Sequence, residues 1–421
     1  MEPSIISIII FGIVVLLFII DKIPSAIVAL MGLTAMLAFK CCTVAEALSG
    51  FASDTFLLLL GMLIVGEALF SSGAAEFIGY YAIKLSNDNE RRFILISCVI
   101  SAIMSAFLTN TAVIAMLMAV CLSASAGSKN MKYRNLVIPV AIAAIAGGHC
   151  TMVGSTTQLT ARGLLEDAAG LTFGMWDLLK VCGPITIVLI LYMTFIGYPH
   201  GKKIWGDRPD EHKDAKAMDD DKAVLSTKGK LALGIFGIVV ILFITNVFST
   251  GVVSMIGAIL CILTGCITQK DAFKKIDWAT IVWLCSCLGI GKALNASGGA
   301  KIIAGGLLNL FDASTSKMLF FAAMVLVAMI LSELMSNMAC LLIIMPATLQ
   351  LAMTNGINPY TIAYGMCLGA ALTYATPLAN GHIGMTMSAG YKFSDYLKYG
   401  IVPSIIAYLM IVVMTPLFYP L

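Results

Sequence analysis

Residues 93–126 read FILISCVISAIMSAFLTNTAVIAMLMAVCLSASA, a long apolar run that is interrupted near its middle by Thr109-Asn110-Thr111. A second apolar run, residues 318–353, is interrupted in the same way by Ser336-Asn337-Met338. The core of a bilayer holds no water, so amides and hydroxyls at that depth must face protein or a cavity. Two matched polar breaks in the two halves of an apolar chain therefore predict a binding site shared between the halves.

The length of these two runs predicts that each folds back on itself. As one helix, residues 93–126 would measure about 51 Å at about 1.5 Å per residue, whereas the hydrocarbon core is about 30 Å thick. Two complete spans would need about 40 residues and a turn. Folded at Thr109–Thr111, each limb is about 22 Å long and ends in a polar tip. We therefore expect re-entrant hairpins over 93–126 and 318–353.

The composition indicates a membrane protein. The chain is 60% hydrophobic and 12% charged, against about 25% charged residues in soluble domains. Repeated apolar runs predict an all-α polytopic protein that lies in a lipid bilayer and has no nucleic-acid partner. Residues 1–20 lack a basic start and a cleavage site, which favours a first membrane helix over a signal peptide. The twelve cysteines lack metal-ligand spacing, so we expect them to pack as small apolar residues.

The two halves of the chain match in detail. Gly66-Glu67-Ala68-Leu69 reappears as Gly291-Lys292-Ala293-Leu294, and Asp177-x-Leu179-Lys180 reappears as Asp395-x-Leu397-Lys398. Repeats of this length are common in secondary transporters. The predicted organisation is a first repeat over 1–199 (hairpin 93–126, broken helix 135–168), a linker over 200–230, and a second repeat over 231–421 (hairpin 318–353, broken helix 359–390).

The basic residues predict the orientation. If both long runs are hairpins, ten true spans remain, five in each half, and the second half starts on the side opposite to the first. With this topology, 20 of the 26 Lys and Arg residues fall on one side, including eight in the linker. Short basic loops stay in the cytoplasm. We therefore expect an inverted repeat in the plasma membrane, the inner membrane of a bacterial cell, with the linker cytoplasmic and both termini outside.

Two further polar stretches predict broken helices. One stretch extends from Gly147-Gly148-His149-Cys150-Thr151 through Gly154-Ser155-Thr156-Thr157-Gln158, and the other is 373–382. Glycine pairs and Thr-Pro break helices, and a half-helix presents free N–H groups to anions or free C=O groups to cations. Serine and threonine can also bond back to their own helix, which would give a simple kink. Four such sites in symmetric positions favour a shared ligand site.

These motifs resemble those of a known family. The paired tips resemble the duplicated Ser-Asn-Thr motif of the divalent anion/sodium symporter family, the carriers of dicarboxylates, citrate and sulfate. Residues 154–158 and 375–380 look like that family's Gly/Ala-Thr-Pro-Pro-Asn breaks. The resemblance covers nearly the whole chain. It implies a homodimer in which transport domains that bear the hairpins move as elevators against a fixed scaffold, with Na⁺ as the coupling ion and no organic cofactor.

The resemblance also implies roles for individual residues. The implied substrate-binding residues are Thr109, Asn110, Thr111, Ser336, Asn337, Thr157, Thr376 and Pro377. The implied sodium-binding residues are Thr109, Asn110, Gly154, Ser336, Asn337 and Ala375. The sequence departs from the family pattern at three places: Thr109 replaces serine, Met338 replaces threonine, and Thr156-Thr157 replaces two prolines. The hydroxyl is kept at the first of these positions and lost at the second.

Three ionisable residues allow two interpretations each. Glu333 precedes Ser336 by three residues, and it either carries a coupling proton or faces a water-filled mouth. His149 and His382 lie in the two predicted breaks, where they either pack as buried side chains or contact a proton or the substrate.

The leading hypothesis is cation-coupled uptake of a small divalent anion, most simply a C4-dicarboxylate. A second hypothesis is another carrier of the ion transporter superfamily: a sodium/proton antiporter, an oxyanion or sulfate carrier, or a dicarboxylate exchanger. The sequence has no HExxH, GxSxG or Walker loop, so we do not expect a membrane-embedded enzyme. No ring of charged residues that would favour a channel is apparent.

Overall fold

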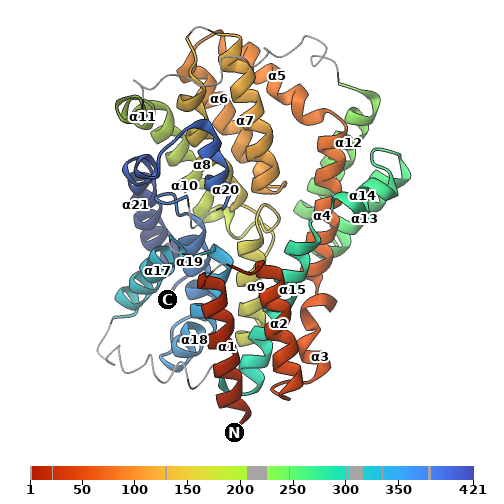
Figure 1. Ribbon diagram of the computed structural model, residues 1–421, viewed down its shortest axis with the longest axis vertical. Helices are drawn as coiled ribbons and strands as arrows, with labels where there is room; N and C mark the ends of the chain where they lie inside the picture. Colours follow the sequence, from red (N-terminus) through yellow and green to blue (C-terminus); the bar gives the residue numbers. More distant parts are fainter. Residues whose placement is uncertain are drawn as a thin grey trace.

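The computed structural model describes residues 2–20, 22–128, 130–205, 225–245, 247–299, 302, 316–333, 335–377 and 381–421. Across these ranges the chain is built from helices and contains no strand (Figure 1). Parts of several predictions fall elsewhere: residues 206–224 of the linker, Lys129 and Lys301 of the charge pattern, and residues 378–380 of the second broken helix lie outside the described residues.

Each half of the chain contains a pair of helices at its predicted hairpin, α6–α7 in the first half and α17–α18 in the second. The first half contains α1 (Pro3–Ile20), α2 (Ser25–Ala38), α3 (Val44–Ala47), η1 (Ser49–Ala52), α4 (Asp54–Ser71), α5 (Ala74–Ser86), α6 (Glu90–Ser105), α7 (Asn110–Ala126), α8 (Tyr133–Gly148), α9 (Thr156–Ala169), α10 (Leu179–Tyr192), η2 (Met193–Gly197) and α11 (Tyr198–Trp205). The second half contains α12 (Thr227–Thr245), α13 (Thr250–Leu263), α14 (Gln269–Lys275), α15 (Trp278–Ala296), α17 (Lys317–Ser332), α18 (Asn337–Thr354), α19 (Pro359–Ala371), α20 (Gly381–Gly384), η4 (Met385–Ala389) and α21 (Phe393–Phe418).

Both long apolar runs are divided at their polar triplets. α6 ends at Ser105 and α7 begins at Asn110, while α17 ends at Ser332 and α18 begins at Asn337. In Figure 1 the pair α6–α7 lies at the top of the molecule and the pair α17–α18 lies in its lower part. The breaks that follow in each half also appear, because α8 ends at Gly148 and α19 ends at Ala371.

The outer surface of several helices is apolar. α21 exposes Ile401, Ile405, Leu409 and Val413, four residues apart, so they form one stripe along the helix. By contrast, every residue of α8 is buried, and α19 is buried on nearly all sides. An exposed apolar stripe of this length suits contact with lipid. The helices that carry the breaks therefore lie at the centre of the molecule, away from that surface.

Six helical segments in the described residues are long and apolar enough to cross a bilayer: 54–71, 179–205, 227–245, 278–296, 337–354 and 393–418. The sequence predicted ten spans. α2 and α13 have 14 residues each, about 21 Å of helix, which is shorter than a perpendicular crossing needs. α18 belongs to the six although its residues were predicted as a hairpin limb. The inverted relation of the two halves stays a prediction.

Packing divides the helices into two groups. In the first group α4 packs along α13 and α2 packs along α15, so each pair joins one helix from each half. In the second group the hairpin helices α6 and α17 pack on α8 and α19, and α10 packs on α21. Helix α5, which the sequence analysis did not predict, contacts α4 in one group and α6 and α7 in the other. Helix α9, which begins at the first break, packs on α18 and α19 and also on α15, so the first break lies where the two groups meet.

The cysteines form no disulfide. All twelve are free thiols, and eleven are buried; Cys42 is half-buried. Among the described residues no group of histidine, cysteine and carboxylate side chains has the arrangement of a metal site.

Candidate functional site

A cavity of about 360 Å³ lies where the two groups of helices meet. Its walls are the tip of the first hairpin (Thr109, Asn110 and Thr111), the first break (153–156), and one side of α4. The second half contributes Met338 from α18, His382 from α20, and three residues around the start of α15: Lys275, Asp277 and Thr280. The structure thus brings residues from both hairpin tips and both broken helices to one cavity.

Asn110 is the best-placed donor on the cavity wall. Its side chain is 1% exposed, and its Oδ1 accepts a hydrogen bond of 2.5 Å from Ser105 Oγ. Its Nδ2 is buried and has no hydrogen-bond partner among the described residues. A buried amide N–H without a partner costs about 1–3 kcal/mol. Asn110 therefore lines the cavity and holds, buried beside it, a donor that no described protein group uses.

The start of α7 adds further donors beside Asn110. The first N–H groups of a helix have no partner within the helix and create a partial positive charge. Thr109 precedes the first turn, and its side chain makes no capping hydrogen bond in the described part of the chain. At the corresponding place before α18, the Ser336 hydroxyl accepts from Ala339 N–H at 3.3 Å. The first helix start is therefore the more open of the two to an anion.

The second tip repeats the bond between serine and asparagine. Ser332 Oγ donates to Asn337 Oδ1 at 2.8 Å, as Ser105 does to Asn110. Ser332 Oγ also contacts the carbonyl oxygen of Ala370 at 2.6 Å, which ties this tip to α19. Asn337 is 7% exposed and is not among the residues that line the cavity.

The first break approaches the first tip closely, and this requires glycine. A Cβ at Gly148 would lie 2.0 Å from Asn110 Oδ1. A Cβ at Gly154 would lie 2.2 Å from the carbonyl oxygen of Ser105 and 2.3 Å from that of Gly148. An amide oxygen therefore lies against Gly148 and two carbonyl oxygens lie against Gly154, and oxygen is the type of ligand that a hard cation prefers.

Gln158 donates hydrogen bonds to two carbonyl groups of the first break. It is fully buried, and its Nε2 donates to the carbonyl oxygens of Gly148 at 2.8 Å and Thr151 at 2.7 Å. Its Oε1 is buried without a hydrogen-bond partner among the described residues. A carbonyl oxygen has two lone pairs, so Gly148 can accept from Gln158 and still ligate a cation. Gln158 therefore holds the carbonyl groups of Gly148 and Thr151 in place within the first break.

Glu333 lies on the second break. Its two carboxyl oxygens accept from Ala375 N–H at 2.9 Å and from Thr376 N–H at 2.8 Å. Thr376 Oγ1 in turn donates to the Glu333 carbonyl oxygen at 2.7 Å. These N–H groups lie in the non-helical stretch after α19, where no carbonyl group of the described helices pairs with them, and an acidic side chain satisfies them. Two roles were expected for Glu333 from the sequence, a carrier of the coupling proton and a residue that faces a water-filled mouth. Neither role includes these hydrogen bonds to the second break.

Met338, where the family pattern has threonine, faces the first half. Thr156 Oγ1 donates to Met338 Sδ at 2.8 Å, which joins the start of α18 to the start of α9. A thioether is only a weak acceptor and donates nothing. At this position the second tip therefore contributes an apolar wall to the cavity.

The two histidines lie on neighbouring elements. His149 directly follows the last residue of α8. Its Nδ1 is 2.6 Å from the carbonyl oxygen of Ile145, and its Nε2 has no hydrogen-bond partner in the described part of the chain. His382 belongs to α20, which packs against α8, and it lines the cavity. Of the two, only His382 is placed for contact with a ligand.

Several predicted site residues lie off the cavity. They are Ser336, Asn337, Thr157, Thr376, Pro377, Ala375 and Glu333. Ser336 is exposed and Thr157 is buried beside Ser155, whose hydroxyl lies 3.3 Å from the Thr157 hydroxyl. Sequence reasoning missed four residues that the structure places at or near the site: Ser105, Ser332, Gln158 and Lys275. The five-residue spacing from serine to asparagine, present in both halves, would have been the signal for two of them.

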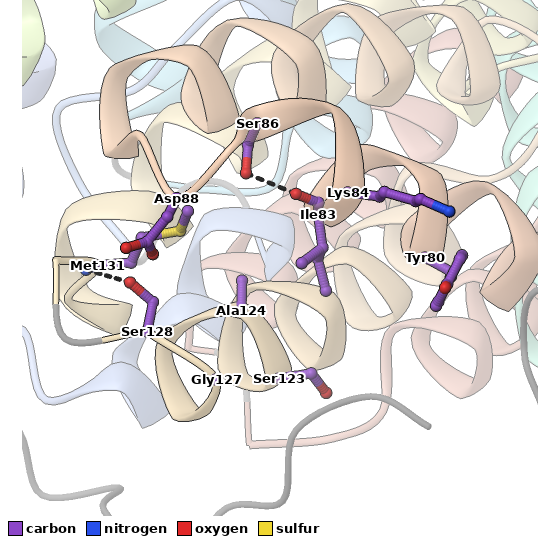
Figure 2. A pocket seen from close by; sticks show the side chains of 10 residues that line it. All are labelled: Tyr80, Ile83, Lys84, Ser86, Asp88, Ser123, Ala124, Gly127, Ser128 and Met131. Carbon is purple, nitrogen blue, oxygen red and sulfur yellow. Dashed lines mark hydrogen bonds between the residues drawn. The ribbon is translucent and has the colours of Figure 1, made fainter. Parts of the chain in front are cut away.

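Other cavities lie toward the far ends of the first hairpin. One, of about 320 Å³, lies between the last turns of α5 and α7 and contains no predicted site residue (Figure 2). Figure 2 shows that two of its hydroxyls bond to nearby backbone: Ser86 Oγ donates to the Ile83 carbonyl oxygen, and Ser128 Oγ accepts from Met131 N–H. These two hydroxyls have local partners, unlike the amide nitrogen of Asn110.

Comparison with known proteins places these features in a family. The family model of the citrate transporters (CitMHS) matches residues 15–369. The uncharacterized transporter YfbS of Escherichia coli is 30% identical over 166 residues, which are 38% of this chain and only 27% of that protein. The uncharacterized transporter MJ0672 of Methanocaldococcus jannaschii is 24% identical over 372 residues, 86% of this chain and 82% of that protein.

Two further similarities extend over most of the chain. The sodium-dependent dicarboxylate transporter SdcS of Staphylococcus saprophyticus is 20% identical over 395 residues, 85% of this chain and 75% of that protein. The crystal structure of the YdaH transporter of Alcanivorax borkumensis superposes with a TM-score of 0.68 at 13% identity, covering 99% of this chain and 98% of that one. This second likeness shows the fold alone. The protein is an integral membrane transporter, and it belongs to the citrate transporter (CitMHS) family.

Proposed function

We propose that the protein is a secondary active transporter that takes up a small divalent anion, a C4-dicarboxylate, together with Na⁺. The observation that carries this proposal is that Asn110, at the start of α7, lines the cavity and that its buried Nδ2 has no hydrogen-bond partner among the described residues. A carboxylate at this position would accept from the Asn110 amide and from the first N–H groups of α7. The hydroxyls of Thr109 and Thr111 line the same wall and add donors.

The cation would bind next to this carboxylate. Its ligands would be Asn110 Oδ1, which lies against Gly148, and the carbonyl oxygens of Ser105 and Gly148, which lie against Gly154. Backbone carbonyls at the end of a half-helix are typical ligands of sodium in secondary transporters. The relative SdcS is a sodium-dependent dicarboxylate transporter, and this similarity supports the same ion and the same class of substrate.

The division of the helices into two groups supports movement of the second group as a unit, in the manner of an elevator. α9 would have to change its contacts during that movement. Arg162 of α9 forms an ion pair with Asp54 of α4 at 3.5 Å, and Asp167 of α9 forms one with Lys292 of α15 at 3.5 Å. Both pairs join the two groups. We further propose that the protein is a homodimer, as the resemblance to the symporter family implies.

The charge pattern supports a location in the plasma membrane with the linker in the cytoplasm and both termini outside. Fusions at the C-terminus test this orientation. We expect an alkaline phosphatase fusion to be active, because this enzyme folds only outside the cytoplasm. We expect a green fluorescent protein fusion to be dark, because this reporter does not become fluorescent when it is exported through the general secretory route. The opposite pair of results would reverse the orientation.

Uptake by the purified protein tests the function. Proteoliposomes would be given labelled succinate, citrate or sulfate, with an inward gradient of Na⁺ or, as the control, K⁺. We expect succinate to accumulate with Na⁺ only, and the variant Asn110→Ala to lose that uptake. Citrate or sulfate uptake without succinate uptake would correct the substrate, and uptake that is equal in both salts would correct the coupling ion. If no anion accumulates, the proposal fails.

A further inference from the structure

The cavity contains one full positive charge among its lining residues. Among the described residues, Lys275, the last residue of α14, is the only lysine or arginine that lines it, and Glu67 and Asp277 are the carboxylates. Asp277 caps the start of α15, where its side chain accepts from Thr280 N–H at 3.1 Å. Lys275 is therefore the residue of the cavity wall with the charge to attract a second carboxylate.

The surroundings of Lys275 hold its ammonium group in place and leave it a donor. Its Nζ lies 2.6 Å from Glu67 Oε1 and 3.2 Å from Ser71 Oγ. Ser71 Oγ donates to the same Glu67 oxygen at 2.6 Å. An ammonium group has three N–H donors, and these two contacts use two of them. The side chain is 49% exposed, so the third donor can reach a ligand in the cavity.

We propose that Lys275 binds the second carboxylate of a dicarboxylate whose first carboxylate lies at the start of α7. This inference rests on the proposed function. Under it, α7 and Asn110 provide affinity for any small carboxylate, and Lys275 makes the site select a dianion over a monoanion. Glu67 positions the ammonium group and offsets part of its charge. The hydrogen bond to Glu67 also raises the pKa of Lys275, so the ammonium group stays charged at neutral pH.

An ion pair on a protein surface usually contributes little and needs no ligand to explain it. A structural ion pair and a ligand-binding lysine differ in how removal of the Glu67 charge should change the affinity for succinate. If the pair is only structural, removing either partner has the same small effect. If Lys275 binds the dianion, Glu67→Gln removes a competing negative charge and strengthens binding, whereas Lys275→Gln weakens it. The opposite signs distinguish a ligand-binding role from a structural one.

The test compares succinate with succinamate, which has the same length but carries an amide in place of one carboxylate. Binding of each to the purified full-length protein would be measured by titration calorimetry in saturating Na⁺. Loss of a hydrogen bond to a charged group corresponds to roughly 10- to 150-fold in affinity. We expect Lys275→Gln to weaken succinate binding by about 10-fold or more, with succinamate binding unchanged. Lys275→Arg should retain most of the preference for succinate.

Lys274→Gln is the matched control, because Lys274 is the exposed neighbour and does not line the cavity. It should bind both ligands like the parent. The inference is overturned if Lys275→Gln keeps the parent's preference for succinate, or if Glu67→Gln weakens succinate binding. If the inference is overturned in this way but Asn110→Ala weakens the binding of both succinate and succinamate, the proposed function still stands. If the parent binds neither ligand, the proposed function and the inference both fail.

Discussion

At the first hairpin tip, Asn110 faces a cavity with its amide nitrogen unpartnered, whereas at the second tip Asn337 lies off the cavity. Both side chains accept from a serine five residues earlier. The residues around them differ. Counting 227 positions back, Glu333 corresponds to Ala106 and Met338 corresponds to Thr111. The second tip thus has a carboxyl group that binds its own broken helix, and a thioether where the first tip has a hydroxyl.

This difference teaches that a duplicated motif need not have a duplicated role. The bond between serine and asparagine shapes both tips, but the neighbouring residues decide whether the tip is open to a ligand. In the first break the donors of Gln158 satisfy carbonyl groups; in the second break the acceptors of Glu333 satisfy N–H groups. The first tip therefore keeps the Asn110 amide donor without a protein partner among the described residues, whereas in the second break Glu333 pairs the N–H groups of Ala375 and Thr376.

The largest expected effect concerns stability. Glu333→Ala removes the acceptor of two N–H groups in the second break, at about 1–3 kcal/mol for each buried group left unpartnered. We expect a clearly lower midpoint of thermal unfolding for the purified variant. Glu166→Ala is the control, because Glu166 is exposed on α9 and should change stability by less than about 0.5 kcal/mol. A Glu333→Ala protein as stable as the parent would show that the second tip does not depend on this clamp.

The next effect separates the two asparagines by function. Asn110→Ala removes the free donor of the cavity, so we expect the KM for uptake to rise roughly five- to 150-fold. Asn337→Ala should lower thermal stability instead and change KM by less than about three-fold, since Asn337 does not line the cavity. Both variants would be measured in the same proteoliposome assay. An equal rise in KM for both would mean that the two tips share the substrate after all.

A smaller effect is expected from the serines. Ser105→Ala leaves the Asn110 amide without the donor that orients it, which should raise KM about two- to ten-fold. Ser332→Ala removes contacts to Asn337 and Ala370 and should lower the unfolding midpoint with KM unchanged. A change of KM in Ser105→Ala and a change of unfolding midpoint in Ser332→Ala would support the difference between the two tips. A change of stability alone in Ser105→Ala would contradict it.

The smallest expected effect comes from Met338→Thr, which restores the hydroxyl of the family pattern. The variant exchanges a sulfur contact with Thr156 for a hydroxyl that can bond to it. We expect the Na⁺ concentration for half-maximal uptake to change by roughly two-fold, about 0.5 kcal/mol, with little change in stability. If neither the Na⁺ dependence nor the substrate preference changes, Met338 is only a wall of the cavity.

Much of the fold could be predicted from the sequence because apolar runs and their polar breaks have a simple meaning in a bilayer. The divisions at 106–109 and 333–336 follow from run length and the position of Asn110 and Asn337. α5 was missed because its 13 residues carry polar side chains and fall below the length of a span. The family, and with it the function as a membrane transporter, followed from the paired motifs.

The site was harder to predict because its contacts join residues far apart in the chain. Glu333 lies 42 residues before Ala375, so the sequence could show that it was unusual but not what it contacts. Lys275 was counted only as one of many basic residues in loops, and its position beside Glu67 depends on how α14 packs on α4. Ser105 resembled any serine that bonds to its own helix. The pairings of Glu333 and Lys275 arise from packing between distant elements, which no local pattern encodes, whereas the Ser105 pairing is marked only by the five-residue spacing that recurs in the second half.

The burial of the thiols has a practical consequence for anyone who handles the protein. Thiols react with water-borne reagents as thiolates, and a side chain enclosed by apolar neighbours is both protonated and out of reach. Eleven of the twelve cysteines are buried, which leaves Cys42 as the one partly accessible native thiol. A probe attached to a newly introduced surface cysteine would therefore have a nearly silent background. Cys42→Ser alone should suffice for fluorescent or spin labels, without replacing the whole set.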